Sequence, residues 1–350
     1  MKEEPSLVRA GQLATAPIGG SIESEVQPVR YTRLGKTDLN VSVLALGTWA
    51  FGGDWGSFDK TDAESAINSA LDNGITLFDT AQAYGFGAAE QLLGESLWKR
   101  VRRDEVIVAT KGGLRVDGTA LVRDTSARWL RAGVEASLRN LSTDYIDLYQ
   151  VHWPDPATPD EETASALNQL VSEGMIRHIG VSNYDAKQLE ALSRHGRVET
   201  LQTPYHMFRR DIEAEILPYT AANDIGVLAY GPLAHGLLAG HMTFETTFPP
   251  DDWRSHSRDF VGATFRRNLD VVAGLNSFAA ERGIPLPQLA VAWTVDNPAV
   301  DVAVVGARRA EQLDALIPAA EVQLSAHDVQ TIHAILADAA PVTGASPEGM

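Results

Sequence analysis

After about residue 28 the chain repeats one unit, an amphipathic helix followed by a turn and a short Ile/Val-rich run that ends in polar residues. The segment "TDAESAINSALDNG" shows the helix, with apolar residues recurring on one face, and "ITLFDT" follows it. Thr61 and Glu64 have the spacing of a capping box, and Gly74 suits the left-handed position after a helix. Most successive strands begin about 30 residues apart, which is the length of a βαβ unit.

Eight segments are predicted to be strands buried on both faces, because most of them are near-continuous apolar runs. Eight such units fit a closed (β/α)8 TIM barrel better than an open sheet. The predicted strands are 44–47, 75–80, 106–112, 145–152, 176–183, 199–205, 226–232 and 300–307.

Two further segments do not follow this repeat. "VRYTRLGKTDLNVSV" has two alternating runs around residues 35–38, and we expect an N-terminal β-hairpin there that plugs the floor of the barrel. The connection 233–263, after the seventh strand, is too long for a plain helix and is predicted to be a lid or binding loop. We therefore expect one barrel domain over 28–340, a flexible N-terminal tail over 1–27 and a flexible C-terminal tail over 341–350.

Composition excludes several classes of function. The formal net charge is −17, from 46 acidic and 29 basic residues, so a nucleic-acid partner or docking on anionic lipid is not expected. The chain has no cysteine, which excludes disulfides, zinc–thiolate sites and cysteine nucleophiles. The sequence shows neither the apolar core of a signal peptide nor a run of about 20 apolar residues, so a cytoplasmic protein is predicted.

The ends of the predicted strands carry polar or aromatic residues, although the strand interiors are almost wholly apolar. In a barrel these ends form one face, where active sites lie. Any one of these residues, taken alone, is as well explained by a structural role, as a cap or a surface group, as by a functional one. Their convergence on one rim is not explained by such structural roles. They are Gly47-Thr48-Trp49, Asp79 with Tyr84, Lys111, His152-Trp153, Ser182-Asn183, Gln202, Tyr230, and Gly306 with Arg308.

Three neighbouring strands bring together groups suited to proton transfer. Lys111 points into the barrel mouth, where a desolvated charge needs a partner, and Asp79 is the natural one. A free phenol has a pKa of about 10, and a nearby ammonium lowers it, so Tyr84 is a candidate proton donor. His152 is placed to hydrogen-bond the oxygen that Tyr84 protonates. The set predicts a proton donor facing a carbonyl oxygen, with no nucleophile and no metal.

Seven ordered motifs, which cover about residues 28–335, resemble the aldo-keto reductase superfamily. They are "FDTAQAYG", "VATKGG", "YQVHWPDP", "IGVSNY", "LQTPYH", "LAYGPLAHGLLAG" and "VVGARRAEQL". The start "LGKTDLNVSVLALGTWAFGG" resembles the bacterial oxidoreductase branches, which include inositol dehydrogenase-like members. The resemblance implies NAD(P)H-dependent reduction of aldehydes and ketones without a metal. It also implies a catalytic tetrad of Asp79, Tyr84, Lys111 and His152, with Tyr84 as the general acid.

The resemblance further implies a cofactor site and a substrate pocket. Ser182, Asn183 and Gln202 would bind the nicotinamide carboxamide, Tyr230 would stack on the ring, and Thr48 would lie close to it. Trp49, Trp153 and Phe86 would line an apolar pocket for a small carbonyl substrate.

Two departures from the family pattern concern the cofactor phosphates. Tyr230-Gly231-Pro232-Leu233 lacks the usual serine, so backbone donors of Leu233, Gly236 and Leu238 would hold the pyrophosphate. The last strand ends in Gly306-Ala307-Arg308-Arg309 in place of a Lys-Ser pair. Arg308 can still fork onto a 2′-phosphate, and Gln312 matches an adenosine contact, which favours NADPH and keeps NADH as the alternative.

Other hypotheses stay open at this point. Some superfamily members are channel-associated β-subunits, so a non-catalytic module that binds cofactor is one alternative, and a polyol or inositol dehydrogenase running in the oxidative direction is another. Gly85-x-Gly87-x-x-Glu90 lacks the third glycine of a dinucleotide fingerprint, which disfavours a Rossmann dehydrogenase. A glycosidase would need two carboxylates across a cleft, and only Asp79 and Asp155 are available at the rim. The sequence predicts neither the substrate nor the oligomeric state.

Overall fold

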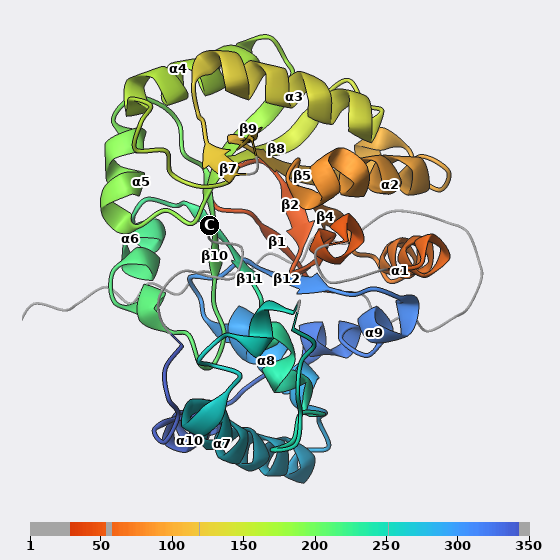
Figure 1. Cartoon of the computed structure of the whole chain (residues 1–350), viewed down its shortest axis with the longest axis vertical. Helices are drawn as coiled ribbons and strands as arrows, with labels where there is room; N and C mark the ends of the chain where they lie inside the picture. The colour runs from red at the N-terminus through yellow and green to blue at the C-terminus, as the bar shows by residue number, and fades with distance from the viewer. Residues whose placement is uncertain (1–28, 54–57, 119, 251, 343–350) are drawn as a thin grey trace, which may run out of the picture.

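Eight parallel strands close into a barrel in the computed structural model, in the order β3-β4-β5-β8-β9-β10-β11-β12 (Figure 1). The structure describes residues 29–53, 58–118, 120–250 and 252–342. The predicted (β/α)8 barrel and its eight strands are confirmed. Their bounds are β3 (Leu44–Gly47), β4 (Leu77–Asp79), β5 (Ile107–Gly112), β8 (Ile146–Val151), β9 (Ile176–Ser182), β10 (Thr200–Pro204), β11 (Gly226–Tyr230) and β12 (Val302–Gly306).

Helices surround the barrel, and α7 and α10 pack on each other at one end of the molecule (Figure 1). No helix within the described ranges is both long and apolar enough to cross a bilayer. The helices are α1 (Lys60–Asp72), α2 (Ala88–Leu97), α3 (Ala127–Leu141), α4 (Asp160–Ser172), α5 (Ala186–Ser193), α6 (Ile216–Ala222), α7 (Gly262–Glu281), α8 (Leu286–Asp296), α9 (Ala310–Asp314) and α10 (Ala326–Leu336).

Helix α1 shows how one unit of the repeat is built. Its N-cap is Asp59, whose carboxylate accepts from the Thr61 and Asp62 amides, so the predicted Thr61–Glu64 capping box is wrong. Aspartate is as good a cap as threonine, and it lies one residue before the helix begins. The helix buries its alanine-rich face and ends before Gly74, which has φ +78° as predicted.

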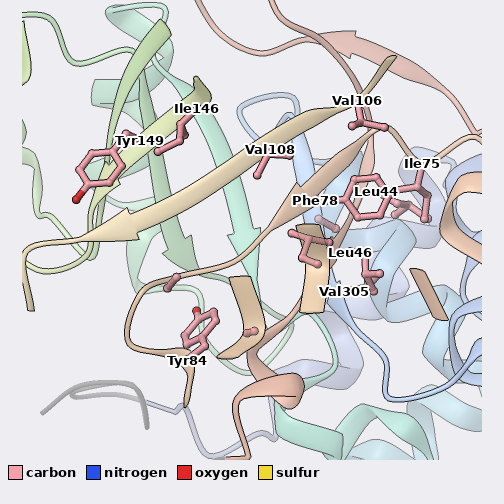
Figure 2. Packing of buried hydrophobic residues seen from close by; sticks show 14 of the residues in the cluster. Leu44, Leu46, Ile75, Phe78, Tyr84, Val106, Val108, Ile146, Tyr149 and Val305 are labelled. Atoms are coloured by element: carbon pink, nitrogen blue, oxygen red, sulfur yellow. The ribbon is translucent and has the colours of Figure 1, made fainter. Parts of the chain in front are cut away.

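Side chains alternate between the two faces of each barrel strand, and this alternation positions the site. Outward residues such as Leu46, Phe78 and Val108 belong to the cluster between strands and helices (Figure 2). Their neighbours Ala45 and Leu77 point inward and fill the lumen. Residues two further along each strand therefore also point into the lumen, at the C-terminal mouth.

The predicted N-terminal hairpin is confirmed as a plug for the barrel floor. Leu34, Leu39 and Val41 are buried in the same apolar cluster as lumen residues Leu148 and Leu228. A second hairpin follows β5, and the sequence reading missed it. The two hairpins are β1 (Tyr31–Arg33) with β2 (Asn40–Ser42), and β6 (Leu114–Asp117) with β7 (Ala120–Arg123).

The long connection predicted after the seventh strand is confirmed between β11 and α7. It contains two 3-10 turns, η5 (Ala234–Ala239) and η6 (Trp253–Ser255). The Trp253 ring contacts the rings of His235 and Phe260, with centroids 5.0 and 5.5 Å apart. Aromatic contacts of this kind fix the loop against the segment that follows β11.

The expected tails 1–27 and 341–350 lie almost wholly outside the described residues. Residues 341 and 342 are the exception, and the Val342 amide donates to the Phe208 carbonyl at 2.8 Å. That hydrogen bond ties the described end of the chain to the connection after β10.

A histidine links the hairpin turn to the barrel floor. His178 Nε2 lies 2.8 Å from Asp38 Oδ1, and its Nδ1 lies 3.0 Å from Glu199 Oε1. Burial by itself would lower the pKa of His178, but the hydrogen bonds and charges of Glu199 and Asp38 outweigh burial and raise that pKa. The folded state thus favours the protonated imidazole more than the unfolded state does.

We predict that His178→Ala destabilises the fold more in mild acid than in mild base. A folded-state pKa above the unfolded value of about 6.5 contributes stability below pH 6.5, and this contribution fades as the pH rises through the folded-state pKa. The loss of unfolding free energy, measured by urea denaturation, should be larger at pH 5.5 than at pH 8.5. The exposed His195→Ala variant serves as the control, and a pH-independent loss in His178→Ala would contradict the prediction.

Candidate active site

The predicted partners Asp79, Lys111 and Tyr84 meet in the barrel mouth. Lys111 Nζ lies 2.6 Å from Asp79 Oδ2, 3.1 Å from the Thr80 carbonyl oxygen and 3.3 Å from Tyr84 Oη. An ammonium has three protons, and three acceptors surround this one. The side chains of all three partners are buried, with Lys111 at 0% exposure.

The strands explain why these groups converge. Asp79 is the last residue of β4 and lies two positions after Leu77, so both side chains point into the lumen. Lys111 stands in the same relation to Ala109 on β5. Tyr84 follows β4 in the 3-10 turn η2 (Tyr84–Gly87), which Figure 2 shows on the loop beside the strands. The lysine therefore lies between the carboxylate and the phenol.

His152 lies one residue beyond the end of β8, with its ring edge-on to Tyr84 at a centroid distance of 5.9 Å. Burial and the nearby Lys111 charge hold the pKa of His152 well below its usual range, so the imidazole is neutral. A neutral imidazole carries one N–H donor, and neither ring nitrogen has a hydrogen-bond partner among the described residues.

The other oxygen of Asp79 is held by two glutamines. Gln202 Nε2 donates to Asp79 Oδ1 at 2.8 Å, and Gln150 Nε2 donates to the same atom at 3.3 Å. Gln202 was predicted to bind the cofactor, and here its amide nitrogen faces Asp79. Gln150 was not predicted. Its signal was a polar residue within an apolar strand, two positions before His152 and hence on the same face.

Residues predicted to hold a carboxamide are already joined to one another. Tyr230 Oη donates to Asn183 Oδ1 at 2.9 Å, while Asn183 Nδ2 reaches Ser182 Oγ at 3.0 Å and the His152 carbonyl at 3.1 Å. Asn183 has φ +64°, a left-handed conformation that asparagine tolerates better than most residues. The network links the ends of β8, β9 and β11.

The segment after β11 has a strained backbone. Ala234, His235 and Gly236 are left-handed in succession, with φ +49°, +53° and +97°. Among the predicted phosphate donors, the Gly236 and Leu238 amides both donate to the Leu233 carbonyl at 3.0 Å in this conformation.

The end of β12 brings the remaining predicted residues together. The Arg308 amide donates to Gln312 Oε1 at 2.8 Å, and nothing lies within 4 Å of a Cβ built on Gly306. The pKa of Asp252 is lowered chiefly by its hydrogen bond with Arg254, and the charge of Arg308 lowers it further. The long loop after β11 thus extends close to Arg308.

Comparison with known proteins decides the family. The profile of the Aldo/keto reductase family matches residues 43–337 of the chain. The chain belongs to this family.

Several relatives of this aldo-keto reductase are known. Aldo-keto reductase YhdN of Bacillus subtilis is 43% identical over 88% of this chain and 94% of its own length. The NADH-specific methylglyoxal reductase of Escherichia coli is 34% identical over 84% of this chain and 94% of its own. The solved structure of glycerol dehydrogenase AKR11B4 from Gluconobacter oxydans is 37% identical, with a TM-score of 0.83 over 91% of this chain and 98% of that one. The protein is therefore a bacterial-branch, NAD(P)H-dependent oxidoreductase.

The three aromatic residues predicted to line the substrate pocket of this aldo-keto reductase differ in burial. The centroids of the Trp49 and Tyr84 rings lie 6.3 Å apart. Trp153 is buried, and Arg123 Cζ lies over its ring, 5.1 Å from the ring centroid. Phe86 is 71% exposed and has φ +50° between two left-handed glycines. Arg123 comes from the hairpin that the sequence reading missed.

The mouth fits a polar ligand such as a nicotinamide. Buried polar atoms are normally hydrogen-bonded, yet several at this face have no partner among the described residues. They are Thr48 Oγ1, both ring nitrogens of His152 and Trp153 Nε1. Over the same residues, no cluster of three or more His, Asp or Glu side chains is arranged to hold a metal ion.

A buried carboxylate behind β5 was also missed. Glu90 is fully buried and accepts hydrogen bonds from Thr110 Oγ1 at 2.7 Å and Asn140 Nδ2 at 2.9 Å. Burial is the main cause that raises its pKa. Because Thr110 precedes Lys111 on β5, Glu90 ties α2 and α3 to the strand that carries the lysine. No local pattern in the sequence indicates this role beyond the polar residue itself.

Proposed function

We propose that this aldo-keto reductase reduces small aldehydes and ketones to alcohols with NADPH, and that Tyr84 is the general acid. The observation that carries the proposal is the position of Lys111 Nζ, 2.6 Å from Asp79 Oδ2 and 3.3 Å from Tyr84 Oη in a buried mouth. This arrangement suits a phenol that gives up a proton near neutral pH.

The direction of the hydrogen bonds supports the role of Tyr84. Lysine can only donate, so the Tyr84 oxygen accepts from Lys111 and the phenol's own proton is not used in that bond. Donation of this proton to an alkoxide leaves a phenolate beside the ammonium, which stabilises it. Asp79 keeps the ammonium in place throughout.

The cofactor and His152 complete the reaction. The reduced nicotinamide, when bound, supplies the hydride that adds to the carbonyl carbon. The neutral His152 orients the carbonyl oxygen with its N–H and leaves the proton transfer to Tyr84. Trp49, Trp153 and Phe86 surround the substrate with apolar surface and limit access of water.

The nicotinamide is proposed to bind through atoms that the resting network leaves available. Gln202 uses its Nε2 on Asp79, and among the described residues its Oε1 receives no hydrogen bond. A carboxamide NH2 can donate to that oxygen, next to Ser182 and Asn183. Tyr230, held by Asn183, would then stack on the ring, with Thr48 on the neighbouring rim.

Preference for NADPH is proposed from Arg308. A guanidinium binds a 2′-phosphate through two parallel hydrogen bonds, and Gln312 beside it would contact the adenosine. The pyrophosphate would bind along Gly231, Pro232, Leu233, Gly236 and Leu238, with Gly306 leaving room for close approach. The Gly236 and Leu238 amides would then exchange their hydrogen bonds to the Leu233 carbonyl for phosphate oxygens. The E. coli relative is named as NADH-specific, so NADH is the competing outcome.

Oxidation of a polyol is the second candidate. It is favoured by the solved relative that is called a glycerol dehydrogenase. The same site runs this reaction in reverse, with the Tyr84 phenolate accepting the proton of the alcohol. Comparison of initial rates with glycerol and NADP+ against aldehydes and NADPH decides between the two directions.

We predict that Tyr84→Phe lowers kcat for reduction of 4-nitrobenzaldehyde by about 10²- to 10⁴-fold, the usual contribution of a general acid. The substitution removes one oxygen and leaves the ring, so the Kd of NADPH should stay near the wild-type value in a fluorescence titration. Tyr219→Phe, on helix α6, is the matched control and should keep full activity. Retained turnover in Tyr84→Phe would remove this tyrosine from the acid role.

We predict that Arg308→Ala raises KM for NADPH by about 10- to 100-fold, because a charged hydrogen-bonding partner of the 2′-phosphate is lost. KM for NADH, which lacks that phosphate, should not change. The exposed neighbour Arg309→Ala is the control for a general loss of positive charge. The phosphate role would be refuted if the wild type had the same kcat/KM with NADPH as with NADH and if Arg308→Ala left both values unchanged.

A further inference from the structure

The hydrogen bond between Gln150 and Asp79 bears on how strongly the ion pair acts on Tyr84. Lys111 Nζ and Asp79 Oδ2 lie 2.6 Å apart, so their opposite charges largely cancel at a distance. Tyr84 lies close to both, and a fully balanced pair would do little to stabilise a phenolate. The effect of Lys111 on Tyr84 therefore depends on how much of the Asp79 charge other groups offset.

The two glutamine amides are placed to offset that charge. Both donate to Oδ1 of Asp79, while Lys111 contacts Oδ2. Beside Lys111 the carboxylate is an acceptor only, so the Gln150 amide presents its NH2 group to it. The positive ends of two dipoles thus face Asp79 from the side away from the ammonium.

The packing around Gln150 shows that the lumen is shaped for this side chain. Gln150 pairs in register with Lys111 on one side and with Gly180 on the other. A Cβ on Gly180 would lie 2.9 Å from Gln150 Cγ and would also clash with Thr200 Oγ1, so the glycine leaves the space that Gln150 fills. Below it, Leu148 occupies the equivalent inward position with an apolar side chain.

The burial of Gln150 lowers the stability of the fold relative to an apolar residue of the same size. It is 0% exposed, and its Oε1 has no hydrogen-bond partner within the described part of the chain. An unsatisfied buried carbonyl destabilises a fold, and an apolar residue of the same size would avoid that loss. The Asp79 contact is the one polar interaction recorded for this side chain among the described residues.

We propose that Gln150 is a positioning residue that acts through Asp79. Its amide offsets part of the negative charge of Asp79, so that Lys111 stabilises the Tyr84 phenolate more and Tyr84 is a stronger acid. The inference rests on the proposed role of Tyr84. Among the described residues the Gln150 side chain forms no hydrogen bond with Tyr84 or with the predicted substrate and cofactor residues, so its influence should appear in proton transfer and not in binding.

The test is the pH dependence of kcat for 4-nitrobenzaldehyde reduction by Gln150→Met, which keeps the length of the side chain and removes the donor. Reduction requires the protonated phenol, so activity falls on the alkaline side as Tyr84 ionises. Without the amide, Asp79 is more negative at Tyr84. The alkaline half-point should therefore rise by about 0.5 to 1 pH unit, and kcat at pH 7 should fall by about 2- to 10-fold.

Thr200→Val is the matched control, because Thr200 is a fully buried lumen residue whose hydroxyl has no partner among the described residues. Its profile should match that of the wild type, and KM and the Kd of NADPH should be unchanged in both variants. An alkaline half-point that does not move in Gln150→Met, or that moves equally in Thr200→Val, would overturn the inference alone. Full turnover in Tyr84→Phe would overturn the proposed function and this inference together.

Discussion

The ion pair between Lys111 and Asp79 is the interaction on which the rest of the site depends. Both groups are buried, so each needs the other, and neither could stay charged alone at this depth. The barrel supplies the geometry, because β4 and β5 are paired strands whose C-terminal inward residues, Asp79 and Lys111, lie side by side at the mouth. Tyr84, His152 and the two glutamines are then arranged around a charge pair that the fold has already fixed.

The apolar barrel beneath the mouth is what gives this pair its effect. The hairpin plug and the inward alanines, leucines and valines exclude water from the lumen, so the electrostatic interactions at its top are stronger than they would be in solvent. The same burial keeps His152 neutral. One architecture therefore buries the Lys111–Asp79 ion pair and keeps the neighbouring imidazole neutral.

Much of this could be predicted from the sequence, for physical reasons. Strand positions follow from apolar runs, and the position of Asp79, Lys111 and His152 follows from the ends of those runs. The hydrogen bonds of Gln150 and Gln202 to Asp79 could not be predicted, because β8 and β10 reach β4 across the lumen and no local pattern records that distance. The β6–β7 hairpin was missed because its strands are short and its residues only partly buried. Glu90 was missed because its partners come from β5 and α3, far away in the chain.

We propose that the Lys111 ammonium makes the Tyr84 phenol a stronger acid than a free tyrosine, in spite of its burial. The most direct test is a pH titration of the phenol by ultraviolet difference absorbance, taking the wild-type curve minus that of Tyr84→Phe. If the ammonium acts in this way, the pKa of Tyr84 lies below the free value of about 10. A phenol that titrates at or above that value would contradict it.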